Sequence, residues 1–189
     1  MESQPRIEPE SGLVVPARQA HSPNQDARPP GMQPELLVLH GISLPPGEFG
    51  GDGVHALFTN TLDPNAHPYY AGLAELRVSA HLLLRRGGEL IQYVPLHRRA
   101  WHAGRSSWGG REACNDFAIG IELEGTDTTP YTAAQYAVLA PLCLAIMRAY
   151  PAIGPERIVG HSDIAPGRKT DPGPAFDWSL LRQRLASEE

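Results

Sequence analysis

Short apolar runs alternate along the chain with polar segments rich in glycine and proline. The run Leu36–His40 lies between Pro34 and the cluster Pro45-Pro46-Gly47, a pattern typical of a buried β-strand. Arg157–Gly160 is a second short run, which predicts a strand that leads directly into His161. A histidine therefore lies at the carboxyl end of each predicted strand.

A glycine pair in the middle of the chain predicts a β-hairpin. The segments Arg77–Arg86 and Glu89–Val94 flank Gly87-Gly88. Because glycine adopts positive φ without steric cost, we expect this pair to form a two-residue loop between antiparallel strands.

The predicted strand Phe117–Glu124 has two chemically different faces, because side chains alternate along a strand. Ile119, Ile121 and Leu123 lie on one face. The other face carries Glu122 and Glu124 among small residues. Unpaired carboxylates are too costly to bury, so we expect this second face to form the floor of a cleft.

Two helices complete the pattern. Thr132 and Gln135 form a predicted capping box before a helix of about eighteen residues, and Pro141 within it predicts a kink or a division into two pieces. Asp177 is the predicted cap of a C-terminal helix that extends to Leu185. The interspersed elements indicate the α/β (α+β) class, with a central mixed sheet flanked by helices in a single domain.

Composition adds the domain limits and excludes some functions. We expect a polar N-terminal segment over residues 1–30 and one catalytic domain over residues 31–189. The net charge of −5 and the pI near 5.9 come without a basic run, which argues against a nucleic-acid partner. No secretory signal or membrane-length apolar run is evident, so we expect a cytoplasmic protein without membrane contact. Cys114 and Cys143 are then expected to be free thiols.

The candidate chemistry centres on His40, His161 and Asp171. Two imidazoles and one carboxylate make a three-ligand Zn²⁺ site whose fourth position stays open to water, as in zinc hydrolases. The alternative for any histidine is a solvated or packed side chain, and spacing alone does not separate the two. The positions of these residues, at a strand end and on both sides of an irregular loop, favour metal binding. Cys114 is a less favoured alternative ligand.

Three further segments carry candidate functional residues. Lys169 lies two residues before Asp171, on the same side of an extended loop, where its ammonium would meet the oxyanion of a tetrahedral intermediate. Glu122 is a candidate general base. A surface lysine and an arginine-paired glutamate are the structural alternatives. The segment Trp101-His102-Ala103-Gly104 is either a groove wall that stacks on a sugar or peptide, or a packed loop.

With these residues in place, the sequence resembles the AmpD family of 1,6-anhydro-N-acetylmuramyl-L-alanine amidases, within the wider amidase and peptidoglycan-recognition fold. The resemblance runs from about Leu36 to Trp178. It is carried by several separate segments: Ile42–Gly50, Ser79-Ala80-His81, Arg99–Gly104, Ile119–Asp127, Gly160–Pro166 and Lys169–Pro174.

The resemblance implies a role for each central residue. It implies Zn²⁺ ligands at His40, His161 and Asp171, a catalytic glutamate at Glu122 and a transition-state lysine at Lys169. It also implies the reaction, hydrolysis of the amide between anhydro-N-acetylmuramic acid and L-alanine during cytoplasmic peptidoglycan recycling. The substrate would be an anhydro-muramyl peptide and the protein a monomer. We expect three residues to bind the substrate: Arg77, Trp101 and His102.

Two positions depart from the family pattern, and two other functions stay open. Gly41 stands where an asparagine is usual, and Ser162 where a cysteine is common.

The same fold also occurs in metal-free proteins that only bind muropeptides, but such a module would lack a ligand. An exported or phage-type amidase that attacks the intact wall would need a route out of the cell.

Overall fold

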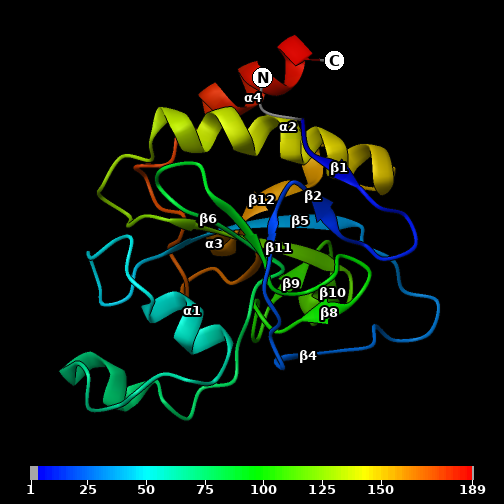
Figure 1. Ribbon diagram of the computed structural model, residues 1–189. Coiled ribbons are helices and arrows are strands. Elements are labelled where there is room, and N and C mark those ends of the chain that lie inside the picture. The colour runs from blue at the N-terminus through cyan, green and yellow to red at the C-terminus, as the bar shows by residue number, and fades with distance from the viewer. Residues whose placement is uncertain (1–3, 189) are drawn as a thin grey trace.

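The structure, a computed structural model, describes residues 4–188 and consists of a β-sheet with two long helices on one face (Figure 1). The strands are β1 Arg6–Ile7, β2 Val14–Val15, β3 Arg18–Gln19, β4 Gln25–Asp26, β5 Leu36–Ile42, β6 Leu82–Leu84, β7 Leu90–Gln92, β8 Arg99–Ala100, β9 Ser107–Trp108, β10 Arg111–Glu112, β11 Ala118–Glu124 and β12 Ile158–Gly160. The helices are α1 Gly53–Phe58, α2 Ala133–Ala149, α3 His161–Ile164 and α4 Trp178–Glu188, with 3₁₀ turns η1 Pro68–Gly72, η2 Cys114–Asp116 and η3 Pro155–Arg157.

The main sheet is mixed, as predicted. Its strand order within residues 4–188 is β12-β5-β11-β6-β7-β3, and β12, β5, β11 and β6 are parallel. Strand β7 runs antiparallel to β6. In the register, His40 on β5 lies opposite Glu122 on β11, and Gly160 on β12 lies opposite Leu39. The carboxyl ends of three neighbouring strands therefore meet at one edge, where parallel sheets commonly bind ligands.

The two faces of the sheet bury different clusters. Ile119, Ile121 and Leu123 are fully buried in the larger cluster, against residues of α2 and α4, which confirms the predicted apolar face of this strand. On the opposite face, Val38 and Ala118 pack against the shorter loops and α3 in a smaller cluster. Burial on both faces explains why β5 is apolar almost to its end.

Both predicted helix caps are confirmed. The Gln135 amide donates to Thr132 Oγ1 at 3.1 Å and the Thr132 amide donates to Gln135 Oε1 at 2.9 Å, which completes the capping box of α2. Asp177 Oδ1 accepts from the Leu180 amide at 2.9 Å at the start of α4. Of the two outcomes expected at Pro141, a division of α2 is wrong, since one helix of 17 residues runs through the proline, and a kink stays a prediction. Burial of the flanking turns offsets the one backbone hydrogen bond that proline removes.

The predicted hairpin is present with a different loop. Strands β6 and β7 pair through Leu84 and Leu90, and the Arg85 amide donates to the Glu89 carbonyl at 2.9 Å. This bond closes a loop of three residues, Arg86, Gly87 and Gly88, and of the two glycines only Gly88 has positive φ, at 91°. The two-residue loop was therefore wrong: the Gly88 amide donates to the Arg85 carbonyl at 2.9 Å, and the turn that this bond closes ends in one left-handed glycine. Strand β6 is also shorter than the predicted 77–86.

The N-terminal segment, where the structure describes it from residue 4, pairs with the rest of the fold. Strand β3 extends the main sheet beside β7, and β4 pairs with β8. The Arg28 guanidinium is largely buried and donates to the carbonyls of Leu96, Asn115, Asp116 and Ala118 at 3.0–3.1 Å. Burial lowers the pKa of Arg28 to about 10. This polar segment thus extends the main sheet at one edge and ties together loops far away in the sequence.

Two remaining expectations concern the cysteines and the membrane. Cys114 and Cys143 are both free and buried, which confirms the prediction of free thiols. None of the helices in residues 4–188 is long and apolar enough to cross a membrane.

Candidate metal and catalytic site

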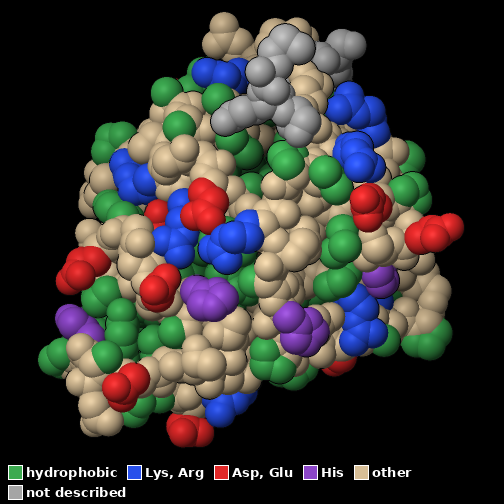
Figure 2. Space-filling model, viewed as in Figure 1, with side chains coloured by type: hydrophobic (Ala, Val, Ile, Leu, Met, Phe, Trp, Pro, Cys, Tyr) green, Lys and Arg blue, Asp and Glu red, His purple; other side chains and the backbone are tan. Residues whose placement is uncertain are grey.

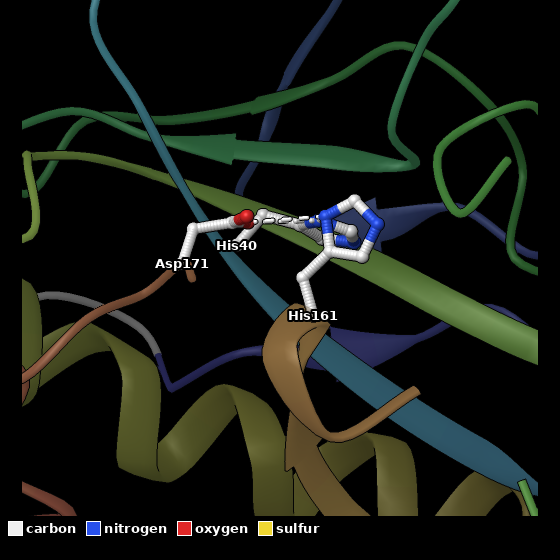
Figure 3. Close-up of side chains that lie close together, drawn as sticks. All are labelled: His40, His161 and Asp171. Carbon is white, nitrogen blue, oxygen red and sulfur yellow. Dashed lines mark hydrogen bonds and ion pairs between the residues drawn. The ribbon is translucent and has the colours of Figure 1, made fainter. Parts of the chain in front are cut away.

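His40, His161 and Asp171 come together at the carboxyl edge of the sheet, and their polar atoms point toward one another (Figure 3). The Nδ1 atoms of the two histidines are 2.9 Å apart. Asp171 Oδ2 lies 3.2 Å from His161 Nδ1 and 3.4 Å from His40 Nδ1. His40 is supplied by β5 and His161 by the first residue of α3, directly after β12. Asp171 belongs to the loop after α3, and its own backbone carbonyl accepts from the Ser162 amide at 3.0 Å.

These atoms fit a tetrahedral metal ion. Bond lengths near 2.0–2.2 Å place neighbouring Zn²⁺ ligands roughly 3.3 Å apart, close to the three observed separations. His161 Nε2 lies 3.2 Å from the carbonyl oxygen of Ala103, which only accepts, so this nitrogen carries the proton and Nδ1 keeps its lone pair. Three electron-pair donors thus converge on one point. A cation there removes the repulsion between them.

The protonation states also suit a metal. Burial lowers the pKa of His40 to about 4, so its imidazole is neutral at pH 7. Burial by itself raises the pKa of Asp171, but contact with the rings of His161 and His40 outweighs burial and holds the pKa below its usual range. Neutral imidazole and ionised carboxylate are the forms that bind metal ions.

Glu122 lies beside the triad with one oxygen free. Its Oε1 is 3.9 Å from His40 Nδ1, and its buried Oε2 has no hydrogen-bond partner within residues 4–188. Burial, and then the nearby charge of Asp171, raise the pKa of Glu122 well above its usual value, while the charge of Lys169 acts in the opposite direction. A carboxyl group with a raised pKa in a cleft is typical of general acid–base catalysts.

Glu124, on the same face of β11, does not share this environment. Only 3% of Glu124 is exposed, and its carboxylate accepts from the amides of Gly50 at 2.9 Å and Arg86 at 3.1 Å. The expectation that both glutamates would line a cleft was therefore wrong for Glu124. Backbone amides compensate its burial, and they have no signature in the sequence.

Lys169 lies in the cleft that contains Glu122, His161 and Asp171. It is also the only lysine among the 16 lysine and arginine residues of the chain. Sequence analysis found Lys169 from its place beside Asp171 and missed this second signal. A chain that uses arginine at every other basic position keeps one compact ammonium at the site.

The cleft has a volume of about 730 Å³, within the roughly 300–1,000 Å³ usual for ligand sites. Trp101 and His102 are among its lining residues. Arg77 is not among the lining residues, because its guanidinium turns back to the carbonyls of Ala74 and Leu76 at 3.0 and 3.3 Å. On the face shown in Figure 2, basic and acidic side chains are interspersed without a continuous basic surface.

Two glycines make room around the triad. A Cβ atom at Gly120 would lie 2.5 Å from Cγ of His102, so only glycine lets this ring lie on the strand. A Cβ at Gly41 would lie 2.3 Å from the Tyr131 hydroxyl, which donates to the Pro172 carbonyl at 3.0 Å. A side chain at position 41 therefore requires the tyrosine ring to shift.

Residues 30–174 match the family model described as N-acetylmuramoyl-L-alanine amidase, and the chain belongs to this family. Within it, the chain is 61% identical to the 1,6-anhydro-N-acetylmuramyl-L-alanine amidase AmpD of Citrobacter freundii over 92% of both chains. A crystal structure of an AmpD selenomethionine derivative matches with a TM-score of 0.91 and 59% identity, over 95% of this chain and 99% of that one. The structure of the amidase AmiD of Escherichia coli, solved with anhydro-N-acetylmuramic acid-L-Ala-D-γ-Glu-L-Lys, matches with a TM-score of 0.59 and 32% identity. The match covers 94% of this chain and 65% of that one.

Proposed function

We propose that this amidase uses Zn²⁺, held by His40, His161 and Asp171, to hydrolyse the amide between 1,6-anhydro-N-acetylmuramic acid and L-alanine in muropeptides. The observation that carries the proposal is the convergence of these three donor atoms beside a carboxylate with an unpartnered oxygen. The substrate follows from the similarity to AmpD over almost the whole chain and from the muropeptide in the AmiD complex. Bound Zn²⁺ would supply a Lewis acid that makes water a nucleophile at neutral pH.

The two proposed catalytic residues have separate tasks. Glu122 takes a proton from the attacking water with its free oxygen and delivers it to the nitrogen of the departing L-alanine. A raised pKa suits both steps, because the group must accept and release a proton near pH 7. The Lys169 ammonium stabilises the negative oxygen that develops on the lactyl carbonyl.

The substrate contacts and the cellular setting belong to the same proposal. Trp101 and His102 line the cleft and are proposed contacts, whereas Arg77 would have to leave its present carbonyl partners to reach a ligand. Both catalytic residues and all three metal ligands come from one chain, which supports a monomer. We place the enzyme in cytoplasmic recycling of cell-wall fragments.

One comparison of substrates tests the proposal. Purified Zn²⁺-loaded protein is incubated with anhydro-muramyl tripeptide and, separately, with intact sacculi. We expect release of the tripeptide from the small substrate and little release from sacculi. Preference for sacculi would instead identify an enzyme of wall lysis, and binding without hydrolysis would identify a recognition module.

A further inference from the structure

The segment His102-Ala103 contacts both histidines of the triad on the side opposite to Asp171. The carbonyl oxygen of Ala103 lies 3.2 Å from His161 Nε2, and His102 Nδ1 lies 2.9 Å from His40 Nε2. One short piece of chain therefore faces the outer nitrogen of each imidazole.

The contact to the Ala103 carbonyl fixes one proton, and metal binding would fix the other. A carbonyl oxygen accepts only, so His161 carries its proton on Nε2 and presents the lone pair of Nδ1. His40 faces the same point through its own Nδ1. When this Nδ1 binds a metal ion, the proton of the neutral ring lies on Nε2 and is donated to His102 Nδ1, 2.9 Å away. His102 must then be protonated on Nε2.

One atom of His102 argues against a purely structural role for the ring. Its Nε2 atom is buried and has no hydrogen-bond partner within residues 4–188, which costs free energy on folding. The ring nevertheless occupies this place, over a glycine that has no Cβ to exclude it. A packing role would be filled at lower cost by an apolar side chain.

The segment is held in place from outside the site. Asn115 Oδ1 accepts from the amides of both His102 and Ala103, at 3.1 and 2.8 Å. One side-chain oxygen thus fixes the two groups that face the metal-binding histidines.

We propose that His102 is a positioning residue for the metal site, which holds His40 in the tautomer that presents Nδ1, and that Asn115 clamps the segment from which both histidines are oriented. The inference rests on the proposed zinc-dependent function, because it concerns the same ligands. Hydrogen bonds to the outer nitrogen of a ligating histidine typically change metal affinity by about 10- to 100-fold.

A matched pair of substitutions tests the role of the acceptor. His102→Asn keeps an oxygen where Nδ1 now lies, and His102→Leu has the same shape without an acceptor. The dissociation constant for Zn²⁺ is measured by competition with a chromophoric chelator, in the full chain. We expect His102→Leu to bind Zn²⁺ about 10- to 100-fold more weakly and His102→Asn to stay within about threefold of the parent, since a neutral acceptor remains.

Two further readouts separate positioning from packing. Long-range ¹H–¹⁵N spectra of the Zn²⁺-loaded parent are expected to show His40 and His161 protonated on Nε2. The metal-free His102→Leu protein is expected to melt close to the parent, because removal of the unpartnered Nε2–H offsets loss of the acceptor that faces His40 Nε2. His97→Leu, at an exposed histidine, is the control and should bind Zn²⁺ like the parent.

The outcomes distinguish this inference from the proposed function. A parent protein that does not bind Zn²⁺ would overturn the proposed function itself. A parent that binds Zn²⁺, with His102→Leu equal to it or equal to His102→Asn, would overturn only the positioning role. If His102→Leu does not fold, Asn115→Leu leaves the imidazole in place and frees both amides. Zn²⁺ affinity should fall there too, and parent-like affinity would contradict the proposal.

Discussion

Glu122 and His40 are register partners across the parallel strands β11 and β5, and Glu122 Oε1 lies 3.9 Å from His40 Nδ1. Pairing in the sheet therefore fixes the distance between the proposed base and a proposed metal ligand. Two residues further along β11, Glu124 points to the same face and binds backbone amides instead. We therefore expect substitution of Glu122 to lower activity and substitution of Glu124 to lower stability.

Glu122→Gln is expected to lower kcat by about 10²–10⁴, because the amide keeps the shape of the side chain but cannot accept a proton. Zn²⁺ content should remain near that of the parent. Thermal unfolding should occur at a higher temperature, since a neutral amide replaces a carboxyl group whose charged form is disfavoured by burial. Metal analysis, kinetics and calorimetry on one preparation check all three. Normal turnover would exclude Glu122 from the chemistry.

Glu124→Gln is expected to act on stability instead. Its carboxylate accepts from two backbone amides, and an NH₂ group in place of one oxygen leaves one amide without an acceptor. We expect the free energy of unfolding to fall by about 1–3 kcal/mol. Zn²⁺ content and kcat of the folded protein should match the parent. A large loss of kcat without loss of stability would contradict the structural role of Glu124.

Lys169→Met should lower kcat by about 10²–10³ and leave the bound Zn²⁺ in place, since the ammonium is assigned to the oxyanion and not to the metal. Lys169→Arg keeps the charge on a wider, planar group and should recover only part of the rate. The two variants separate charge from shape. Loss of Zn²⁺ in Lys169→Met would show that the lysine supports the ligands.

Removal of the metal should abolish hydrolysis, and added Zn²⁺ should restore it, because water is a nucleophile at neutral pH only when a metal ion activates it. His40→Ala, His161→Ala and Asp171→Ala should each lose both Zn²⁺ and turnover. Equilibrium dialysis followed by elemental analysis measures the binding. Parent-like affinity in any one variant would show that its residue is not a ligand.

The lowered pKa of His81 determines one part of how the stability of the metal-free protein depends on pH. Burial, and then the charge of Arg28, lower the pKa of His81 to about 3 in the folded protein, while the unfolded chain titrates near pH 6.5. The unfolded state therefore binds the proton first. Stability from this group is fully present above about pH 6.5 and falls by about 1.4 kcal/mol per pH unit below it, down to about pH 3.

Urea unfolding between pH 6 and 4 measures this slope. His81→Gln removes the titrating group. The free energy of unfolding of this variant should therefore fall with decreasing pH less steeply than that of the parent, by about 1.4 kcal/mol per pH unit. Equal slopes would show that His81 takes up its proton in the folded protein as well.

The sequence alone identified the parts of the site that local patterns determine. His40 ends an apolar strand, His161 follows a short one, and the alternation along Phe117–Glu124 placed Glu122 away from the core. Because parallel strands end at one edge, these assignments needed only the strand order to become a site. The fold class and the helix caps were predicted for the same reason.

What the sequence could not supply are contacts whose partner is a distant backbone group. Glu124 is satisfied by the amides of Gly50 and Arg86, and the guanidinium of Arg28 by carbonyls about ninety residues further on. Every residue carries such groups, so their use leaves no pattern in the chain. For the same reason the contact between His102 and His40 became visible only once the two segments were placed together.

The single lysine gives the molecule a built-in reporter. A protease that cuts after lysine has one bond to attack, between Lys169 and Thr170, and both residues line the cleft. Digestion of the folded chain therefore yields two fragments, and a muropeptide that occupies the cleft should slow the cut. Cleavage followed on a gel then measures binding without label or turnover, even in variants that have lost all hydrolysis.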